Sequence, residues 1–333
     1  MSELNTVLKN KMVWICALGY FVDMFDLVLF GIVRIPSLKA LGVAEIDIQK
    51  IGAQLLNYQM TGLIIGGFFW GLMGDKVGRL KTLFASIFLY SLANLLNAFI
   101  INIDYYAFLR FLAGFGLAGE LGVAVTLIAE ILPKNNRGFG TTIIGFAGFL
   151  GAICAALTAR YSTWKIIYLI GGIIGFILLI TRLSAHESIL FSKSNQKNQF
   201  HKTIKLLFTS RDRVWRYFKL ILVGIPIWFV SGILIYFSPE FSKELNVDGT
   251  VLAGSAILWC YMGSLLGDIF SGYISQKLKS RKKAINFFLW LLCFVIIGYV
   301  FFTSKCHDIS ILYYLFFTWY REWVLDPSHN NVC

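Results

Sequence analysis

The stretch VWICALGYFVDMFDLVLFGIV at residues 13–33 is apolar except for two acids, Asp23 and Asp26, near its middle. About 20 apolar residues are enough for a helix to cross the hydrocarbon core of a bilayer. An acid at that depth costs about 2.5–3.5 kcal/mol on insertion scales, so it needs a partner, a proton or a function. The stretch therefore predicts a membrane-spanning helix that carries a functional position.

The whole chain has the composition of a membrane protein. Of its 333 residues, 57% are hydrophobic and 14% are charged, whereas a soluble domain is about a quarter charged. A tenth apolar run begins near Ile309 and stops early. Nine longer ones precede it, at about 13–33, 51–73, 82–101, 105–128, 139–159, 164–183, 218–237, 251–275 and 284–303. Runs of this length predict helices rather than barrel strands, so the predicted fold class is an all-α polytopic membrane protein.

The net charge of +12 is distributed unevenly along the chain. If the N-terminus lies in the cytoplasm and the spans alternate, most lysines and arginines fall on the cytoplasmic side, and Arg34 lies beyond the outer end of the first span. This bias predicts a multi-pass plasma (inner) membrane protein with a cytoplasmic N-terminus. Nucleic acid is not an expected partner, because the basic segments lack a folded reader.

Enzymes, metal proteins and channels are not indicated. The six cysteines are scattered without paired spacing, so neither a disulfide framework nor a metal site is predicted, and no cofactor is expected. No histidine lies inside a span, so a proton relay would have to use carboxylates. Neither HExxH nor GxSxG occurs, which argues against an enzyme. A channel would need a filter-like loop or rings of charge.

One long polar break, residues 184–216, divides the chain after six apolar runs. We expect a six-helix bundle at 1–183, a cytoplasmic linker at 184–216 and a partial second bundle of about three and a half helices at 217–318. The turn GLMGDKVGRLK (71–81) is repeated as GYISQKLKSRK (272–282). Internal repeats of six helices are typical of secondary transporters.

Several motifs together resemble the major facilitator superfamily, in particular its sugar-porter and metabolite or aromatic-acid proton-symporter branches. They are DMFD (23–26), GLMGDKVGRLK (71–81), Arg110 with GFGLAGELG, Glu130 with Pro133 and Arg137-Gly138, and Trp164-Lys165 with HESILF (186–191). Their order covers about residues 10–318. The resemblance implies a major facilitator fold in which the substrate binds between two six-helix bundles that open alternately to each side. The residues themselves predict, in addition, a substrate/proton-coupling group and a conformational latch.

The coupling group is expected to include Asp23, Asp26, Arg110 and Glu120. Asp26 lies about 20 Å from the cytoplasmic end of its span, and Arg110 about 8 Å below the outer surface. In a core of about 30 Å these depths coincide. An acid that alternates between pairing with arginine and holding a proton can couple transport to protons. The alternatives are a static Asp26–Arg110 pair that fixes packing, and a Glu120 that stays protonated.

The latch is expected at the cytoplasmic ends of the helices, where a substrate site is the alternative. Its predicted members are Gly71, Asp75, Lys76, Gly78, Arg79, Glu130 and Arg137. Glycines spaced three or four residues apart are expected to allow close helix packing. They are Gly62, Gly66, Gly67 and Gly71 in the second span and Gly145, Gly148 and Gly151 in the fifth.

The predicted function is secondary active transport of a small organic solute, by alternating access and as proton symport. The solute could be an organic acid, an amino-acid-like zwitterion or a sugar, and facilitation remains an alternative to symport. The expected partners are that solute, protons and the lipid bilayer, and the protein is expected to be a monomer. A transporter-like sensor is a further alternative.

Another alternative is an inactive truncated chain. After YYLFFT (313–318) the sequence becomes WYREWVLDPSHNNVC (319–333), whose charges interrupt a span barely begun. Trp is encoded only by TGG, so a shift of one base turns Trp319 and Trp323 into glycines, as the repeat of the fourth span would have. On this reading residues 319–333 are a frameshifted tail and the second bundle is incomplete.

Overall fold

The computed structural model describes residues 7–133, 137–183, 210–244, 251–277 and 290, and all regular elements in these ranges are helices. The chain divides into two compact units, residues 1–213 and 214–333. The predicted all-α fold class is confirmed. The runs at 284–303 and near Ile309, the linker residues 184–209 and the tail 319–333 lie outside the described residues.

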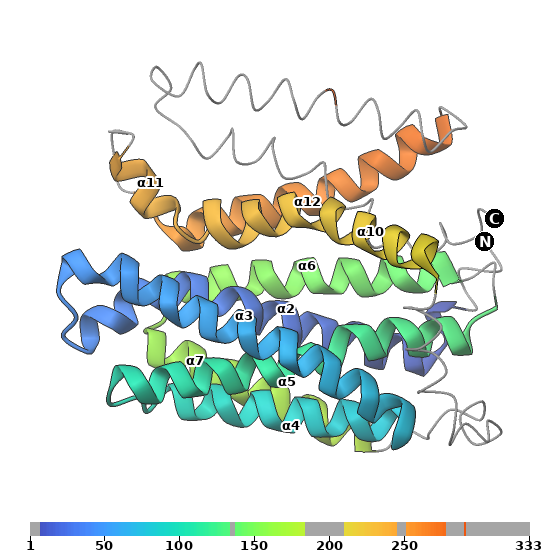
Figure 1. Ribbon diagram of the computed structural model, residues 1–333, viewed down its shortest axis with the longest axis horizontal. Helices are drawn as coiled ribbons and strands as arrows, with labels where there is room; N and C mark the ends of the chain where they lie inside the picture. Colours follow the sequence, from blue (N-terminus) through green and yellow to red (C-terminus); the bar gives the residue numbers. More distant parts are fainter. Residues whose placement is uncertain (1–6, 134–136, 184–209, 245–250, 278–289, 291–333) are drawn as a thin grey trace. The chain divides into compact units, whose positions relative to one another are not determined.

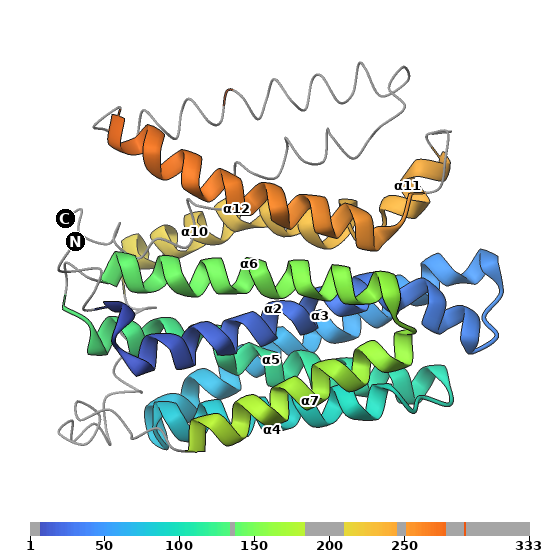
Figure 2. The same cartoon turned by 180° about the vertical axis from the view of Figure 1, so that it is seen from behind.

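The first unit is a bundle of long helices (Figures 1 and 2). They are α2 (Lys11–Ala40), α3 (Glu45–Lys76), α4 (Arg79–Asn97), α5 (Ile103–Ile131), α6 (Arg137–Tyr161) and α7 (Trp164–Leu183). The pairs in closest contact are α3 with α5, α2 with α6, α4 with α5 and α4 with α7. Every predicted apolar run of this part corresponds to one of these helices.

Helix α2 is longer than the predicted span. It begins at Lys11, where the Asn10 side chain accepts a hydrogen bond of 3.0 Å from the Met12 amide, and it continues past Arg34 to Ala40. Arg34 was expected to lie beyond the outer end of the span, but only 1% of its surface is exposed. The helix continues because the residues after Arg34 also pack inward, with Ser37 and Leu38 buried.

Glycines allow two helix pairs in the first unit to approach closely. A Cβ at Gly62 or Gly66 of α3 would collide with the backbone of α5 at Phe111 or Phe115. On α6, Gly151 packs in the same way against the α2 backbone at Phe21, and Gly148 packs against the Tyr20 side chain of α2. Four of the seven predicted packing glycines therefore have this role, whereas Gly67, Gly71 and Gly145 have open space around them.

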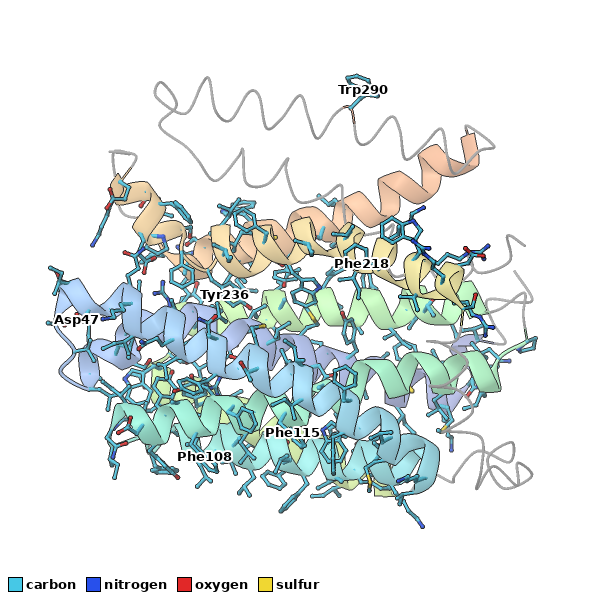
Figure 3. All side chains as sticks on the ribbon, viewed as in Figure 1. Asp47, Phe108, Phe115, Phe218, Tyr236 and Trp290 are labelled. Carbon is cyan, nitrogen blue, oxygen red and sulfur yellow. The ribbon has the colours of Figure 1, made fainter. Side chains whose placement is uncertain are left out.

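The outer surface of the first unit carries large apolar side chains. Phe68 is 76% exposed, and Phe108, which Figure 3 labels on α5, is 59% exposed. Exposed apolar surface of this kind is suited to contact with lipid tails rather than water. By length and hydropathy, three of the described helical segments could cross a membrane, namely Lys11–Ala40, Gly140–Tyr161 and Trp164–Thr181.

The described part of the second unit contains three helical segments. The first, α10 (Arg211–Phe229), runs directly into a π-helical stretch, η2 (Val230–Leu234), and α11 (Ser238–Glu244) and α12 (Ala253–Lys277) follow. Helix α10 starts inside the range expected to be linker, because its first turns are polar residues that continue the helix of the apolar run. The run predicted at 251–275 corresponds to α12.

Candidate functional site

Asp26 and Arg110 lie together in the interior of the first unit. Asp26 on α2 is 5% exposed, and Arg110 on α5 is completely buried. The two side chains interact electrostatically, as their predicted depths suggested. The structure thus places these two residues near each other, and their role in proton coupling stays a prediction.

Asn94 of α4 joins the two charged groups. Its side-chain oxygen accepts a hydrogen bond of 3.1 Å from Nη2 of Arg110, and its amide interacts with the Asp26 carboxyl. Asn94 is 1% exposed, so water does not compete for these contacts at the protein surface. A neutral amide can donate to a carboxylate and accept from a guanidinium at the same time. Asn94 was not among the residues predicted for the site.

The Asp26 carboxyl fits against helix α7 because residue 171 is glycine. A Cβ at Gly171 would lie 2.6 Å from Oδ1 of Asp26, closer than real Cβ contacts. Phe25 and Leu29 of α2 lie 3.5 and 3.6 Å from the same point. The lack of a side chain at Gly171 therefore provides the space that the carboxyl occupies.

Two tyrosines extend the site toward the end of α2. The hydroxyl groups of Tyr106 on α5 and Tyr168 on α7 are 2.6 Å apart, and Tyr106 is also 3.1 Å from the hydroxyl of Ser37 on α2. All three residues are fully buried. These hydrogen bonds connect three helices around Arg110.

A second buried arginine, Arg34, lies near the same hydroxyl groups. It interacts electrostatically with Tyr106. Gly52 of α3 gives it room, because a Cβ there would be 2.7 Å from Cδ and 2.8 Å from Nη1 of Arg34. The sequence reading missed Arg34 because it treated the charge as the end of the span.

The other predicted coupling acids occupy different levels of the bundle. Asp23 is 4% exposed and lies one turn before Asp26 on α2. Glu120 is completely buried. It lies ten residues after Arg110 on α5, which corresponds to about 15 Å along the helix. Asp23 is thus a neighbour of the Asp26 group, whereas Glu120 is separated from it.

The predicted latch residues cluster around helix ends. Gly71, Asp75 and Lys76 are in the last turns of α3, Arg79 begins α4, Glu130 is near the end of α5, and Arg137 begins α6. Gly78 connects α3 and α4 with φ +114° and ψ 152°. Lys76 is exposed. The helix ends are placed as expected, and the latch itself stays a prediction.

In the part of the chain that the structure describes, no group of three or more His, Cys, Asp or Glu could hold a metal ion. Among the described residues, Cys16, Cys154 and Cys260 form no disulfide. The buried polar side chains that the structure describes in the first unit are carboxyl, guanidinium, amide and hydroxyl groups, beside the buried Cys16 thiol.

Comparison with known proteins gives a family and a set of relatives. Residues 16–320 match the sequence profile of the Major Facilitator Superfamily. The sialic acid transporter NanX of Escherichia coli (strain K12) is 29% identical over 282 residues, which cover 82% of this chain and 67% of the relative. The niacin transporter NiaP of Acinetobacter baylyi is 31% identical over 185 residues, which cover 54% of this chain and 40% of the relative.

A third relative, the benzoate transport protein of Acinetobacter baylyi, is 23% identical and matches 77% of this chain and 62% of its own length. The chain therefore spans about two thirds or less of these relatives. Among solved structures, the partially occluded inward-open xylose transporter XylE from E. coli is similar, with a TM-score of 0.70 at 16% identity. That match covers 98% of this chain and 83% of the solved one, and it supports the fold.

Proposed function

Because the chain belongs to the Major Facilitator Superfamily, we propose that it transports a small organic acid across a membrane by proton-coupled symport. The observation that carries the proposal is the buried group of Asp26, Asn94 and Arg110. The organic-acid class is supported by the relatives, which are named as transporters of sialic acid, niacin and benzoate. No catalytic chemistry is proposed, since the family consists of transporters rather than enzymes.

Proton coupling would come from competition for the Asp26 carboxyl. A buried carboxylate is stabilised by a neighbouring guanidinium, whereas burial itself favours the protonated acid. Asp26 is subject to both effects at once. A small change in helix position would then shift Asp26 between interaction with Arg110 and binding of a proton. A static pair would need neither the proton nor the movement.

Asn94 supports a switching role over a static one. An Asp–Arg pair built only for stability would be expected as a bidentate ion pair with both oxygens engaged. Here one side of Arg110 is bound by the neutral Asn94 oxygen at 3.1 Å. The amide can keep that contact whether or not Asp26 is protonated, so Arg110 remains partly satisfied in both states.

The first experiment is uptake by the complete chain reconstituted in proteoliposomes. Radiolabelled sialic acid, nicotinate, benzoate, an amino acid and xylose are offered with and without an inward pH gradient. We expect one of the acids to accumulate only with the gradient. Accumulation of the sugar or the amino acid would overturn the substrate class, and equal uptake with and without the gradient would overturn symport. A chain without uptake or exchange of any of these solutes would contradict the transport proposal.

The role of Asp26 is tested with Asp26→Asn. We expect this variant to lose gradient-driven accumulation but to retain part of the solute exchange, because its side chain can no longer release a proton. Asp104→Asn is the matched control, since Asp104 is an exposed acid in the first turn of α5. Asp26→Asn protein that accumulates solute like the unmodified chain would remove Asp26 from the coupling mechanism.

The latch and the orientation are part of the same proposal. We assign the turn between α3 and α4 to the cytoplasmic side together with the N-terminus. A cysteine introduced at the exposed Lys76 should then react with a membrane-impermeant maleimide only when the cytoplasmic face is accessible. Asp75→Asn should increase the labelling of cytoplasmic cysteines if the latch stabilises the outward-open state. If the introduced cysteine is labelled equally with and without Asp75→Asn, the result would argue against the latch.

A further inference from the structure

The guanidinium of Arg110 is surrounded by aromatic rings as well as by Asp26 and Asn94. Its central carbon lies 5.1 Å from the ring centre of Tyr168, 5.5 Å from that of Phe30 and 5.9 Å from that of Tyr106. Each distance is within the range of about 6 Å at which a ring face attracts a cation. The rings come from three different helices, α7, α2 and α5.

The three rings are held in place by contacts with one another. Tyr106 packs edge-on against both others, at 6.0 Å and 78° to Phe30 and at 6.4 Å and 88° to Tyr168. The hydrogen bonds from Tyr106 to Tyr168 and to Ser37 fix the outer edges of the two tyrosines. Edge-to-face packing is a favourable arrangement for aromatic pairs. The ring positions are therefore determined before the guanidinium is considered.

A completely buried guanidinium needs compensation in each state of the site. When Asp26 is ionised, its charge contributes to that compensation. When Asp26 binds a proton, the anion is lost while Arg110 stays charged, because guanidinium is not deprotonated in proteins. A buried charge without compensation is costly, so something else must stabilise Arg110 in the protonated state.

The neighbouring helices offer few other charges to Arg110. Helix α2 presents Asp26, with Asp23 one turn before it, and Arg34, which interacts electrostatically with Tyr106. Helix α4 presents the neutral Asn94, α5 itself presents Tyr106, and α7 presents Tyr168. Arg34 repels rather than stabilises a second cation. Besides the neutral Asn94 oxygen, the ring faces still attract the cation after Asp26 binds a proton, and they then carry a larger share of its stabilisation because the carboxylate charge no longer competes for it.

We propose that Phe30, Tyr106 and Tyr168 form an aromatic cage that stabilises the Arg110 guanidinium when Asp26 is protonated. The three are positioning residues, which act on the coupling step through Arg110. The role of the cage in transport rests on the proposed proton coupling at Asp26, but the existence of the cage can be tested without a transport assay.

The test is a double-mutant cycle on the thermal stability of the complete purified chain in detergent. Phe30→Leu is made alone and together with Asp26→Asn, which imitates the protonated acid. Leucine fills much of the space of phenylalanine but has no ring face. We expect Phe30→Leu to lower the melting temperature by about 2–4 °C more in the Asp26→Asn background than in the unmodified chain.

Two control variants separate the ring from other effects. Phe149→Leu changes a buried phenylalanine on α6, whose ring is not among those over Arg110. This variant should lower the melting temperature by the same amount in both backgrounds. Tyr161→Phe removes a hydroxyl group from an exposed ring at the end of α6, so its effect on the melting temperature should also be independent of Asp26→Asn. Equal losses for Phe30→Leu in the two backgrounds would overturn the cage.

A second readout uses the pH dependence of uptake. If the cage stabilises the proton-loaded state, Phe30→Leu should move the pH of half-maximal accumulation to a more acid value by about half a unit or more. Phe149→Leu should leave this midpoint unchanged. A shift toward alkaline pH would also overturn the cage. If uptake shows no pH dependence at all, the proposed proton coupling fails, and the stability cycle still decides whether the cage exists.

Discussion

Gly171 of α7 lies directly against the carboxyl group of Asp26, so that a Cβ at residue 171 would be 2.6 Å from Oδ1. Contacts under 3.0 Å are essentially never seen for real Cβ atoms, and something would have to move. The carboxyl is the end of a short side chain held between α2, α4, α5 and α7. The position of the acid thus depends on the absence of a side chain on the neighbouring helix.

We therefore predict that Gly171→Ala displaces the Asp26 carboxyl and impairs the site. The overpacking should lower the stability of the protein by about 1–3 kcal/mol. Gradient-driven accumulation should fall more than solute exchange, because the displaced group is the one assigned to coupling. Both effects are measured on the same reconstituted protein.

Gly145→Ala is the control for this variant, because Gly145 is also in a helix of the first unit but has open space around it. It should retain both stability and accumulation. If Gly171→Ala behaves like Gly145→Ala in both assays, the close contact with Asp26 has no functional consequence.

A second prediction concerns the packing of α3 against α5. A Cβ at Gly66 would collide with the carbonyl oxygen of Phe115 and lie 2.9 Å from its Cα. Backbone cannot rotate away as a side chain can, so the two helices would have to separate. Gly66→Ala should destabilise the protein by about 1–3 kcal/mol, measured as a lower thermal midpoint in detergent.

The adjacent Gly67 provides a matched control, since nothing lies within 4 Å of a Cβ built there. Gly67→Ala should be neutral or slightly stabilising, because alanine favours a helix over glycine by about 1 kcal/mol. A similar stability for the two variants would show that α3 and α5 can separate at little cost.

The regular part of this fold can be predicted from sequence because membrane helices are specified by composition. The first apolar run, 13–33, lies inside α2 (Lys11–Ala40), and the sixth, 164–183, coincides with α7 (Trp164–Leu183). The error at the end of α2 arose because Arg34 is charged, and a charge usually marks the end of a span. Its burial depends on Gly52 of the neighbouring helix, which no local pattern reveals.

The part of the site that could be predicted is the part whose depth in the membrane follows from counting residues along a span. Asp26 and Arg110 were matched because each lies a known number of residues from a span end. Asn94, Tyr106 and Tyr168 were missed because the prediction rested on charged groups in the spans, and these side chains are neutral. The sequence did contain one signal for the site on α2. Phe30 and Ser37 follow Asp26 by four and eleven residues, so all three lie on the same face of the helix. The partners from α4 and α7 required the tertiary structure.

A third prediction concerns the hydrogen-bonded hydroxyl groups of Ser37, Tyr106 and Tyr168. Tyr106→Phe would remove the hydroxyl that connects Ser37 at 3.1 Å and Tyr168 at 2.6 Å. Both partners are buried and would lose this hydrogen bond, so we expect a loss of stability of about 1–3 kcal/mol. The thermal midpoint of the purified protein is the measurement.

Tyr161→Phe serves as the comparison, since Tyr161 at the end of α6 is 83% exposed. Its hydroxyl can exchange a protein contact for water, and the change should be close to neutral. Equal midpoints for Tyr106→Phe and Tyr161→Phe would mean that the hydroxyl connection adds no stability to the bundle.

The last prediction concerns Gly78, which connects α3 to α4. The backbone there has φ +114° and ψ 152°, a conformation that is essentially restricted to glycine. The Gly78 carbonyl also accepts two hydrogen bonds from Thr82, at 3.2 Å from the amide and 2.9 Å from the hydroxyl. The turn therefore cannot relax without losing the first hydrogen bonds of α4.

Gly78→Ala should accordingly cost about 1–3 kcal/mol of stability through backbone strain alone. Gly71→Ala is the matched control within the same predicted latch, because Gly71 is inside α3 and has open space around it.

A pure turn function predicts that only Gly78→Ala lowers the thermal midpoint. It also predicts that the folded Gly78→Ala protein is labelled normally at a cysteine in place of Lys76. A latch function predicts, in addition, altered labelling for Gly78→Ala, because Asp75 and Arg79 flank the turn. Unchanged stability of Gly78→Ala would contradict both readings, since it would mean that the connection adopts another conformation at no cost.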